Sequence, residues 1–216
     1  MKPAESRSGM PGNDEMRRAA RRGAAGGRRG FTLVELLVVI AMISILATLA
    51  VFSFQRLVKS AGTSEAVAMI QSIRAAEEAY KAETLVYLGC SGCGGSGCAP
   101  GGGSLTAYYP QTTNAPSDKK WHWQNPNHSD YACWNMLHVG ADGPVQFGYS
   151  VVAGSPANTP PATSLSTPPN WPVPQEGWYV VQAAGDRDND LTYAIVVGAS
   201  FSFGSGSGVA VEKDDE

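Results

Sequence analysis

The sequence predicts an α+β fold in which one long N-terminal helix packs on a small antiparallel sheet. Three observations support this prediction. Residues 31–54 form an apolar run with a single charge, residues 55–88 continue it with helical spacing of apolar side chains, and three strand-like runs follow residue 105. A helix laid on three or more antiparallel strands buries the apolar face of each element in a common core.

The apolar run, residues 31–54, is long enough to span a membrane. Its 24 residues, at about 1.5 Å of rise each, would reach ~36 Å as a helix, which exceeds the hydrocarbon core of a bilayer. The preceding segment, residues 1–30, is basic, with eight Lys or Arg against three Asp or Glu. This positive-inside pattern predicts that residues 1–30 stay in the cytoplasm and that the C-terminal part crosses the membrane.

The start of the apolar run carries a recognisable signal. An ordinary secretory signal has its small-residue cleavage site after the apolar core, whereas here Gly30 precedes that core. The run G-F-T-L-V-E-L-L-V-V-I-A, from Gly30 to Ala41, resembles the class III signal of type IV prepilins and type II secretion pseudopilins. In that family a prepilin peptidase cuts after the glycine and methylates the new amine. The resemblance implies a pilin-like fold, cleavage between Gly30 and Phe31, N-methylation of Phe31, and removal of residues 1–30.

Glu35 is the only charge in the apolar run and has two interpretations. With Thr32 it forms the T-x-x-E pattern of a capping box, which begins many helices. A carboxylate in a membrane segment costs roughly 2.5–3.5 kcal/mol at the bilayer centre and less near an end, and capping alone does not require such a location. The resemblance implies instead that Glu35 pairs with the Phe31 amine of a neighbouring subunit during assembly. We favour this assembly role.

Residues 55–88 are predicted to continue the helix as an amphipathic segment. The expected apolar face comprises Ala66, Met69, Ile70, Ile73, Ala76 and Tyr80. Two opposite-charge pairs four residues apart are expected on the solvated side, Arg74–Glu78 and Glu77–Lys81. A Gly/Cys-rich loop follows at residues 89–104, and its composition cannot form a core by itself.

The prediction places a strand-rich globular head at residues 105–203. Its three expected strands are residues 145–152, 177–184 and 191–197. A strong turn signal at residues 185–190 separates the last two, so we expect them to pair as a hairpin. Residues 153–176 hold seven prolines and are expected to be a loop, and residues 204–216 a flexible acidic tail.

Four cysteines follow the apolar run: Cys90, Cys93, Cys98 and Cys133. Beyond a membrane segment they would face an oxidising compartment, so we expect two disulfide bonds. Four cysteines allow three pairings, and the sequence does not choose among them. The alternative is a zinc site that also uses His122, His128 or His138. We favour the disulfides, because the spacing lacks a second C-x-x-C and exported thiols oxidise.

Asp186, Asp188 and Asp190 alternate in the predicted turn and resemble the start of a calcium loop. Leu191 occupies the place of the glycine that an EF-hand requires, and Val197 the place of its distal glutamate. We therefore favour a solvated turn over a calcium site, and the prediction includes no metal and no cofactor.

An aromatic and basic cluster is the remaining candidate for ligand binding. It consists of Lys119, Lys120, Trp121 and Trp123. Such side chains can stack on single-stranded DNA or on sugar rings, but in a small head the tryptophans can equally fill the core. We favour the core interpretation. Residues 31–216 hold twice as many acidic as basic residues, which argues against broad capture of nucleic acid.

These features predict a structural protein rather than an enzyme, since no nucleophile elbow, phosphate loop or paired-carboxylate motif occurs. The resemblance implies a type IV pilus subunit that inserts in the inner membrane and polymerises through its N-terminal helix into an extracellular or periplasmic filament. Its implied partners are prepilin peptidase, the membrane and other pilins. Two alternatives stay open: a minor pilin that binds DNA or a surface ligand, and a type II secretion pseudopilin.

Overall fold

The computed structural model describes residues 30–113, 115–187, 189–202 and 208–212. Apart from Gly30, the predicted leader therefore lies outside the described residues. The chain divides into two compact units, residues 1–52 and residues 53–216. A long N-terminal helix followed by a small antiparallel sheet confirms the predicted α+β, pilin-like architecture.

Helix α2, Leu33–Thr84, contains all of the apolar run except Phe31 and Thr32. Thr32 caps its first turn, because the Thr32 Oγ1 accepts the backbone N–H of Glu35 at 3.2 Å. Within α2, Leu33–Phe54 has a mean hydropathy of 2.7 and is not buried, and by length and composition it is able to cross a membrane.

Helix α2 ends at Thr84, earlier than the predicted end at residue 88. Leu85 adopts a φ of 65°, the left-handed conformation that commonly ends helices, and its N–H donates to the Lys81 carbonyl at 2.8 Å. The sequence signal for this end is weak, because leucine occupies the position where glycine is usual and the next glycine is Gly89.

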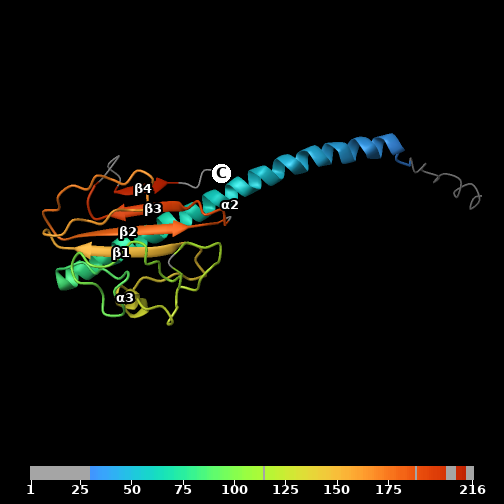
Figure 1. Cartoon of the computed structure of the whole chain (residues 1–216). Helices are drawn as coiled ribbons and strands as arrows, with labels where there is room; N and C mark the ends of the chain where they lie inside the picture. The colour runs from blue at the N-terminus through green and yellow to red at the C-terminus, as the bar shows by residue number, and fades with distance from the viewer. Residues whose placement is uncertain (1–29, 114, 188, 203–207, 213–216) are drawn as a thin grey trace, which may run out of the picture. The chain divides into compact units, whose positions relative to one another are not determined.

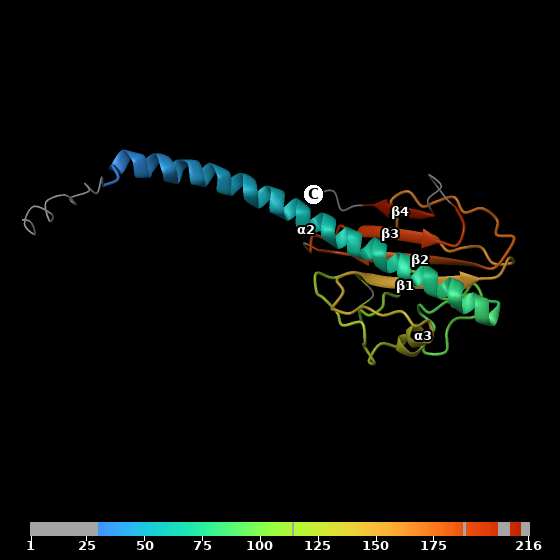
Figure 2. The ribbon, with the colours of Figure 1, turned by 180° about the vertical axis from the view of Figure 1, so that it is seen from behind.

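The second unit is built on a four-stranded antiparallel sheet with the strand order β1-β2-β3-β4 (Figure 1). The strands are β1 Gly148–Gly154, β2 Trp178–Gly185, β3 Ala194–Ala199 and β4 Val209–Glu212. Strands β2 and β3 pair as the predicted hairpin, with Gly185 opposite Ala194. The short helix α3, Tyr131–Met136, lies beyond β1 on the side away from β4 (Figures 1 and 2).

The structure corrects the predicted start of the first strand and the prediction for the C-terminal tail. Residues 145–147 do not belong to β1, since Val145 forms an isolated bridge with Trp121 and the strand begins at Gly148. Residues 209–212, predicted as part of a flexible tail, form β4 because their alternating valines complete the sheet beside β3. Residues 204–207 and 213–216 of that tail lie outside the described residues.

Both faces of the sheet are covered. The second half of α2 runs along one face (Figure 2), where alternate strand residues such as Val181 and Val196 are buried with it. The residues of α2 in this core are Ala66, Met69, Ile70 and Ile73, with Ala76 and Tyr80 partly buried beside them, which confirms the predicted apolar face. Loop residues, among them Leu105 and Leu165, cover the intervening strand residues on the opposite face.

Glu77 belongs to the buried face of α2, so the prediction of a solvated Glu77–Lys81 pair is wrong. Glu77 follows Ile70 and Ile73 at helical spacing and is 0% exposed. Lys81 instead donates to the Tyr87 hydroxyl at 3.1 Å, and the same hydroxyl donates to a Glu78 carboxylate oxygen at 3.0 Å.

Candidate functional site

The predicted processing residues lie at the start of α2. Phe31 is 81% exposed, and Gly30 and Glu35 are exposed as well. Among the described residues, no atom beyond the neighbours of Gly30 in the chain would lie within 4 Å of a Cβ added at that position. The helix begins only at Leu33, so the Gly30–Phe31 peptide bond is in non-helical, accessible backbone. This geometry is open to a peptidase that must bind the chain before cutting it.

The capping role and the carboxylate of Glu35 are separate in the structure. The cap contact joins the Thr32 Oγ1 to the backbone N–H of Glu35 and does not use the Glu35 side chain. Any residue except proline provides this N–H. The carboxylate is therefore not needed for the cap, and the Glu35 side chain is exposed.

The four cysteines form two disulfide bonds, Cys90–Cys133 and Cys93–Cys98. This is one of the three pairings that the sequence left open. Cys90 and Cys133 are fully buried, whereas Cys93 is exposed. The first bond joins positions 43 residues apart and ties the Gly/Cys-rich loop to α3. Closing so long a loop restricts the unfolded chain more than the short Cys93–Cys98 bond does.

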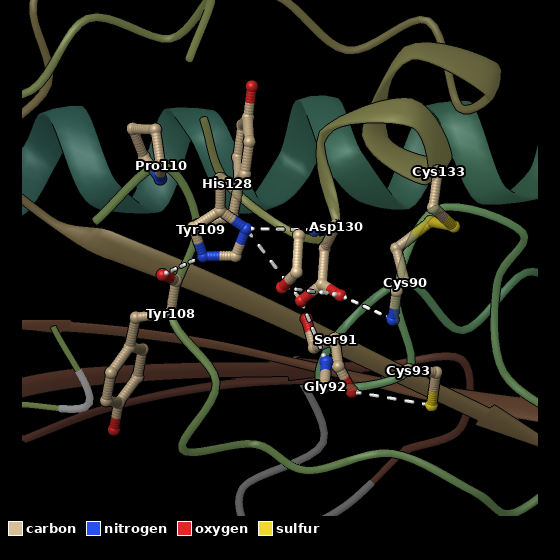
Figure 3. A network of polar contacts seen from close by, with 12 residues as sticks. Cys90, Ser91, Gly92, Cys93, Tyr108, Tyr109, Pro110, His128, Asp130 and Cys133 are labelled. Atoms are coloured by element: carbon tan, nitrogen blue, oxygen red, sulfur yellow. Dashed lines mark hydrogen bonds and ion pairs between the residues drawn. A yellow bond between two sulfur atoms is a disulfide. The ribbon is translucent and has the colours of Figure 1, made fainter. Parts of the chain in front are cut away.

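The side chain of Asp130 also holds the Gly/Cys-rich loop (Figure 3). Its two carboxylate oxygens accept the N–H groups of Gly92 at 2.8 Å and Gly94 at 2.9 Å. His128 supports this arrangement, because its Nδ1 accepts the Asp130 N–H and its Nε2 lies 3.1 Å from the Tyr108 carbonyl. Both ring nitrogens of His128 are therefore occupied, so this side chain is not available to zinc. The cysteine sulfurs are also unavailable, because all four form disulfide bonds.

The aromatic cluster predicted as a ligand patch divides into two parts. Trp123 is 3% exposed, and its Nε1 donates to the Val139 carbonyl at 2.7 Å. Its ring packs edge to face against Tyr109 and Trp134, with centroids 5.1 and 5.6 Å apart. Trp121 is only half-buried, and the neighbouring Lys119 and Lys120 are exposed. Trp123 is thus a core residue and does not form a surface platform with Trp121.

The acidic turn between β2 and β3 is closed by its own carboxylates. Asp186 is 1% exposed and accepts the N–H groups of Asn189 at 2.7 Å and Leu191 at 3.2 Å. Asn189 and Leu191 adopt positive φ, which delays β3 to Ala194 instead of the predicted residue 191. Asp190 accepts the Thr192 N–H at 2.7 Å, and Asp188 lies outside the described residues. Over the part of the chain that the structure describes, no group of three or more potential ligands could hold a metal.

Gln182 is a structural residue that the sequence analysis missed. It lies in β2 on the loop-covered face and is fully buried. Its Oε1 accepts the Ser164 N–H at 2.8 Å, and its Nε2 donates to the Tyr108 hydroxyl at 3.0 Å and the Leu105 carbonyl at 3.2 Å. One amide thus joins two loops to the sheet. The sequence signal that could have found Gln182 is a single amide side chain within an otherwise apolar strand, because a buried amide needs hydrogen-bond partners.

A family model for the prokaryotic N-terminal methylation motif matches residues 26–51. The matched residues include Gly30, Phe31 and Glu35, and those before Gly30 lie outside the described part of the chain. No curated protein and no solved structure matches the chain. Residues 26–51 therefore carry the methylation motif that forms the class III signal of type IV pilins and pseudopilins.

Proposed function

We propose that this chain is a structural, non-enzymatic subunit of a type IV pilus or a pilus-like filament. The observation that carries the proposal is the methylation motif, which coincides with the exposed start of a long apolar helix. Prepilin peptidase cuts between Gly30 and Phe31 and methylates the Phe31 amine. The motif supports this processing, and the open backbone at Gly30 is compatible with it.

Assembly then uses the apolar part of α2. Before assembly, Leu33–Phe54 lies in the inner membrane with residues 1–30 in the cytoplasm, as the basic leader favours. In the filament, helices of neighbouring copies cover one another, and the heads form an extracellular or periplasmic surface. The Glu35 carboxylate of one copy pairs with the Phe31 amine of the next. Exclusion of water among the helices strengthens this attraction.

A filament subunit is preferred to a minor pilin that binds DNA or a surface ligand. The burial of Trp123 leaves Trp121 as the only tryptophan of the pair with part of its surface exposed. A type II secretion pseudopilin carries the same motif and uses the same helix. The abundance of the protein in sheared filament fractions separates a major subunit from both of these roles.

The test is co-expression of the full-length chain with a prepilin peptidase, followed by mass spectrometry of the mature N-terminus. The expected product begins with N-methylated Phe31. Gly30→Leu should block the cut, while the matched control Gly27→Leu, in the same leader, should be processed. Retention of residues 1–30 in assembled material would remove the basis of the proposal.

A further inference from the structure

Glu77 is an ionisable group buried in the core between α2 and the sheet. It is 0% exposed and lies on the same helix face as Ile70 and Ile73. Its Oε2 accepts the backbone N–H of Leu88 at 2.9 Å. Its Oε1 has no hydrogen-bond partner in the part of the chain that the structure describes. One carboxyl oxygen therefore holds the chain just after the end of α2, and the other is unsatisfied.

Within the described part of the chain, no cation compensates this carboxyl group. Among the described residues, no Lys or Arg nitrogen forms an ion pair with Glu77. Arg74 donates to Gln71 at 3.1 Å, and Lys81 donates to Tyr87. The other ionisable groups described near this end of the helix are Glu78, Tyr80, Glu83, Tyr87, Glu176 and Tyr179, none of which is cationic. On this side of β1, the core residues Val151 and Ala153 are apolar.

Burial without a cation favours the neutral acid, because an unpaired buried charge is costly. Burial raises the pKa of Glu77 from 4.5 to about 8, although the Leu88 N–H lowers it and the charge of Glu78 adds to the rise. A groove of about 330 Å³ is lined by Tyr80, Leu85 and Leu88. Displacing Leu88 would therefore bring Glu77 towards solvent.

We propose that Glu77 is a proton-operated latch: its neutral carboxyl holds residues 85–89 against α2 through the Leu88 N–H, and loss of the proton releases that segment. The segment begins with Leu85 and Val86, both exposed, and leads directly into the buried Cys90–Cys133 disulfide. The latch does not depend on the filament role.

The direction of the pH effect follows from linkage. The closed state has the raised pKa of about 8, and a released Glu77 regains the ordinary value of 4.5. The closed state therefore binds more protons, and it is most stable below the ordinary pKa. The opening constant should rise about tenfold per pH unit between these two values and then level off.

The test is hydrogen exchange at the Leu88 amide in the full-length chain in detergent micelles, between pH 5 and pH 9. The protection factor, which is the intrinsic exchange rate divided by the observed rate, should fall about tenfold per pH unit up to about pH 8. Glu77→Gln keeps a neutral acceptor for the Leu88 N–H and should give a flat profile. Glu83→Gln removes an equal charge from an exposed position of α2 and should keep the steep profile.

Local release also requires lower protection at Leu88 than at Val181 in the core of β2 at every pH. Equal protection at the two amides would mean unfolding of the whole head and would overturn the latch. A flat profile in the unsubstituted chain would overturn it without any variant. If the protection of Leu88 still falls steeply with pH in Glu77→Gln, the group that loses the proton is not Glu77, and the proposal is rejected.

Discussion

Asp130 and Gly92 are 38 residues apart in the sequence, yet the Asp130 Oδ2 accepts the Gly92 N–H at 2.8 Å. The other carboxylate oxygen accepts the N–H of Gly94 at 2.9 Å. A glycine-rich loop loses much conformational entropy on folding and has few side chains to offset that loss. The buried Asp130 carboxylate accepts two charge-assisted hydrogen bonds from this loop, which replace the side-chain contacts that glycines cannot make.

Replacing Asp130 by alanine should loosen the Gly/Cys-rich loop. Two backbone N–H groups would lose their acceptor, which should reduce the free energy of unfolding by roughly 1–3 kcal/mol. Thermal melting of the full-length chain in detergent measures this loss. Asp142→Ala removes the same charge from an exposed position and serves as the control. Equal melting temperatures for the two variants would contradict an anchoring role for Asp130.

Replacing Glu35 by alanine should abolish filament assembly and preserve the helix. The variant keeps the backbone N–H that Thr32 caps, and the membrane segment becomes more apolar, so insertion should continue. Thr32→Ala is the matched control, because it removes the cap, worth about 1 kcal/mol, and keeps the carboxylate. Filament yield from sheared cells, normalised to membrane-inserted protein, distinguishes the two roles. Normal yield from Glu35→Ala would rule out the assembly role.

The two disulfides should differ in their access to reductant. Alkylation of the exported, denatured but unreduced protein should label no cysteine. Under mild reduction of the folded protein, Cys93 and Cys98 should be labelled first, because Cys93 is exposed while Cys90 and Cys133 are buried. Mass spectrometry of the labelled peptides gives the order. If all four cysteines are labelled before reduction, the disulfide bonds are absent and the cysteines would again be candidate metal ligands.

Trp123 and Trp121 should contribute differently to stability. Trp123→Ala removes a buried ring from the core and should reduce the free energy of unfolding by roughly 3–5 kcal/mol. Trp121→Ala should have a smaller effect, since that side chain is half-buried. Thermal melting compares the variants. A stable Trp123→Ala protein that has lost DNA or glycan binding would move the chain to the minor-pilin role.

Local sequence patterns were sufficient for several parts of the fold. The apolar face of α2 repeats at helical spacing, and the Asp-rich turn lies between two β-forming runs, so the helix and the β2–β3 hairpin could be predicted. The processing residues lie within one contiguous motif. The same helical spacing would also have placed Glu77 on the buried face, but the local charge pair with Lys81 suggested the solvated side. Here the periodicity was the better guide.

Other features depend on contacts between distant residues. Strand β4 is short and follows a Gly/Ser stretch, and it is stable because β3 offers a pairing edge. The anchoring of Gly92 by Asp130 leaves no local pattern in either segment. Leu85 ends α2 in a conformation that glycine normally adopts, so a leucine at this position does not predict the end of the helix. These are cases in which tertiary contacts outweigh local preference.

The coverage of both sheet faces determines which residues an antibody or a phage could recognise on the head. All residues of β1, β2 and β3 are buried, so the recognisable surface consists mostly of loops and the outer side of α2. Loops tolerate substitution far better than packed strands do. The antigenic character of the head can therefore change extensively while its sheet is preserved, and two proteins with the same strands could share no epitope.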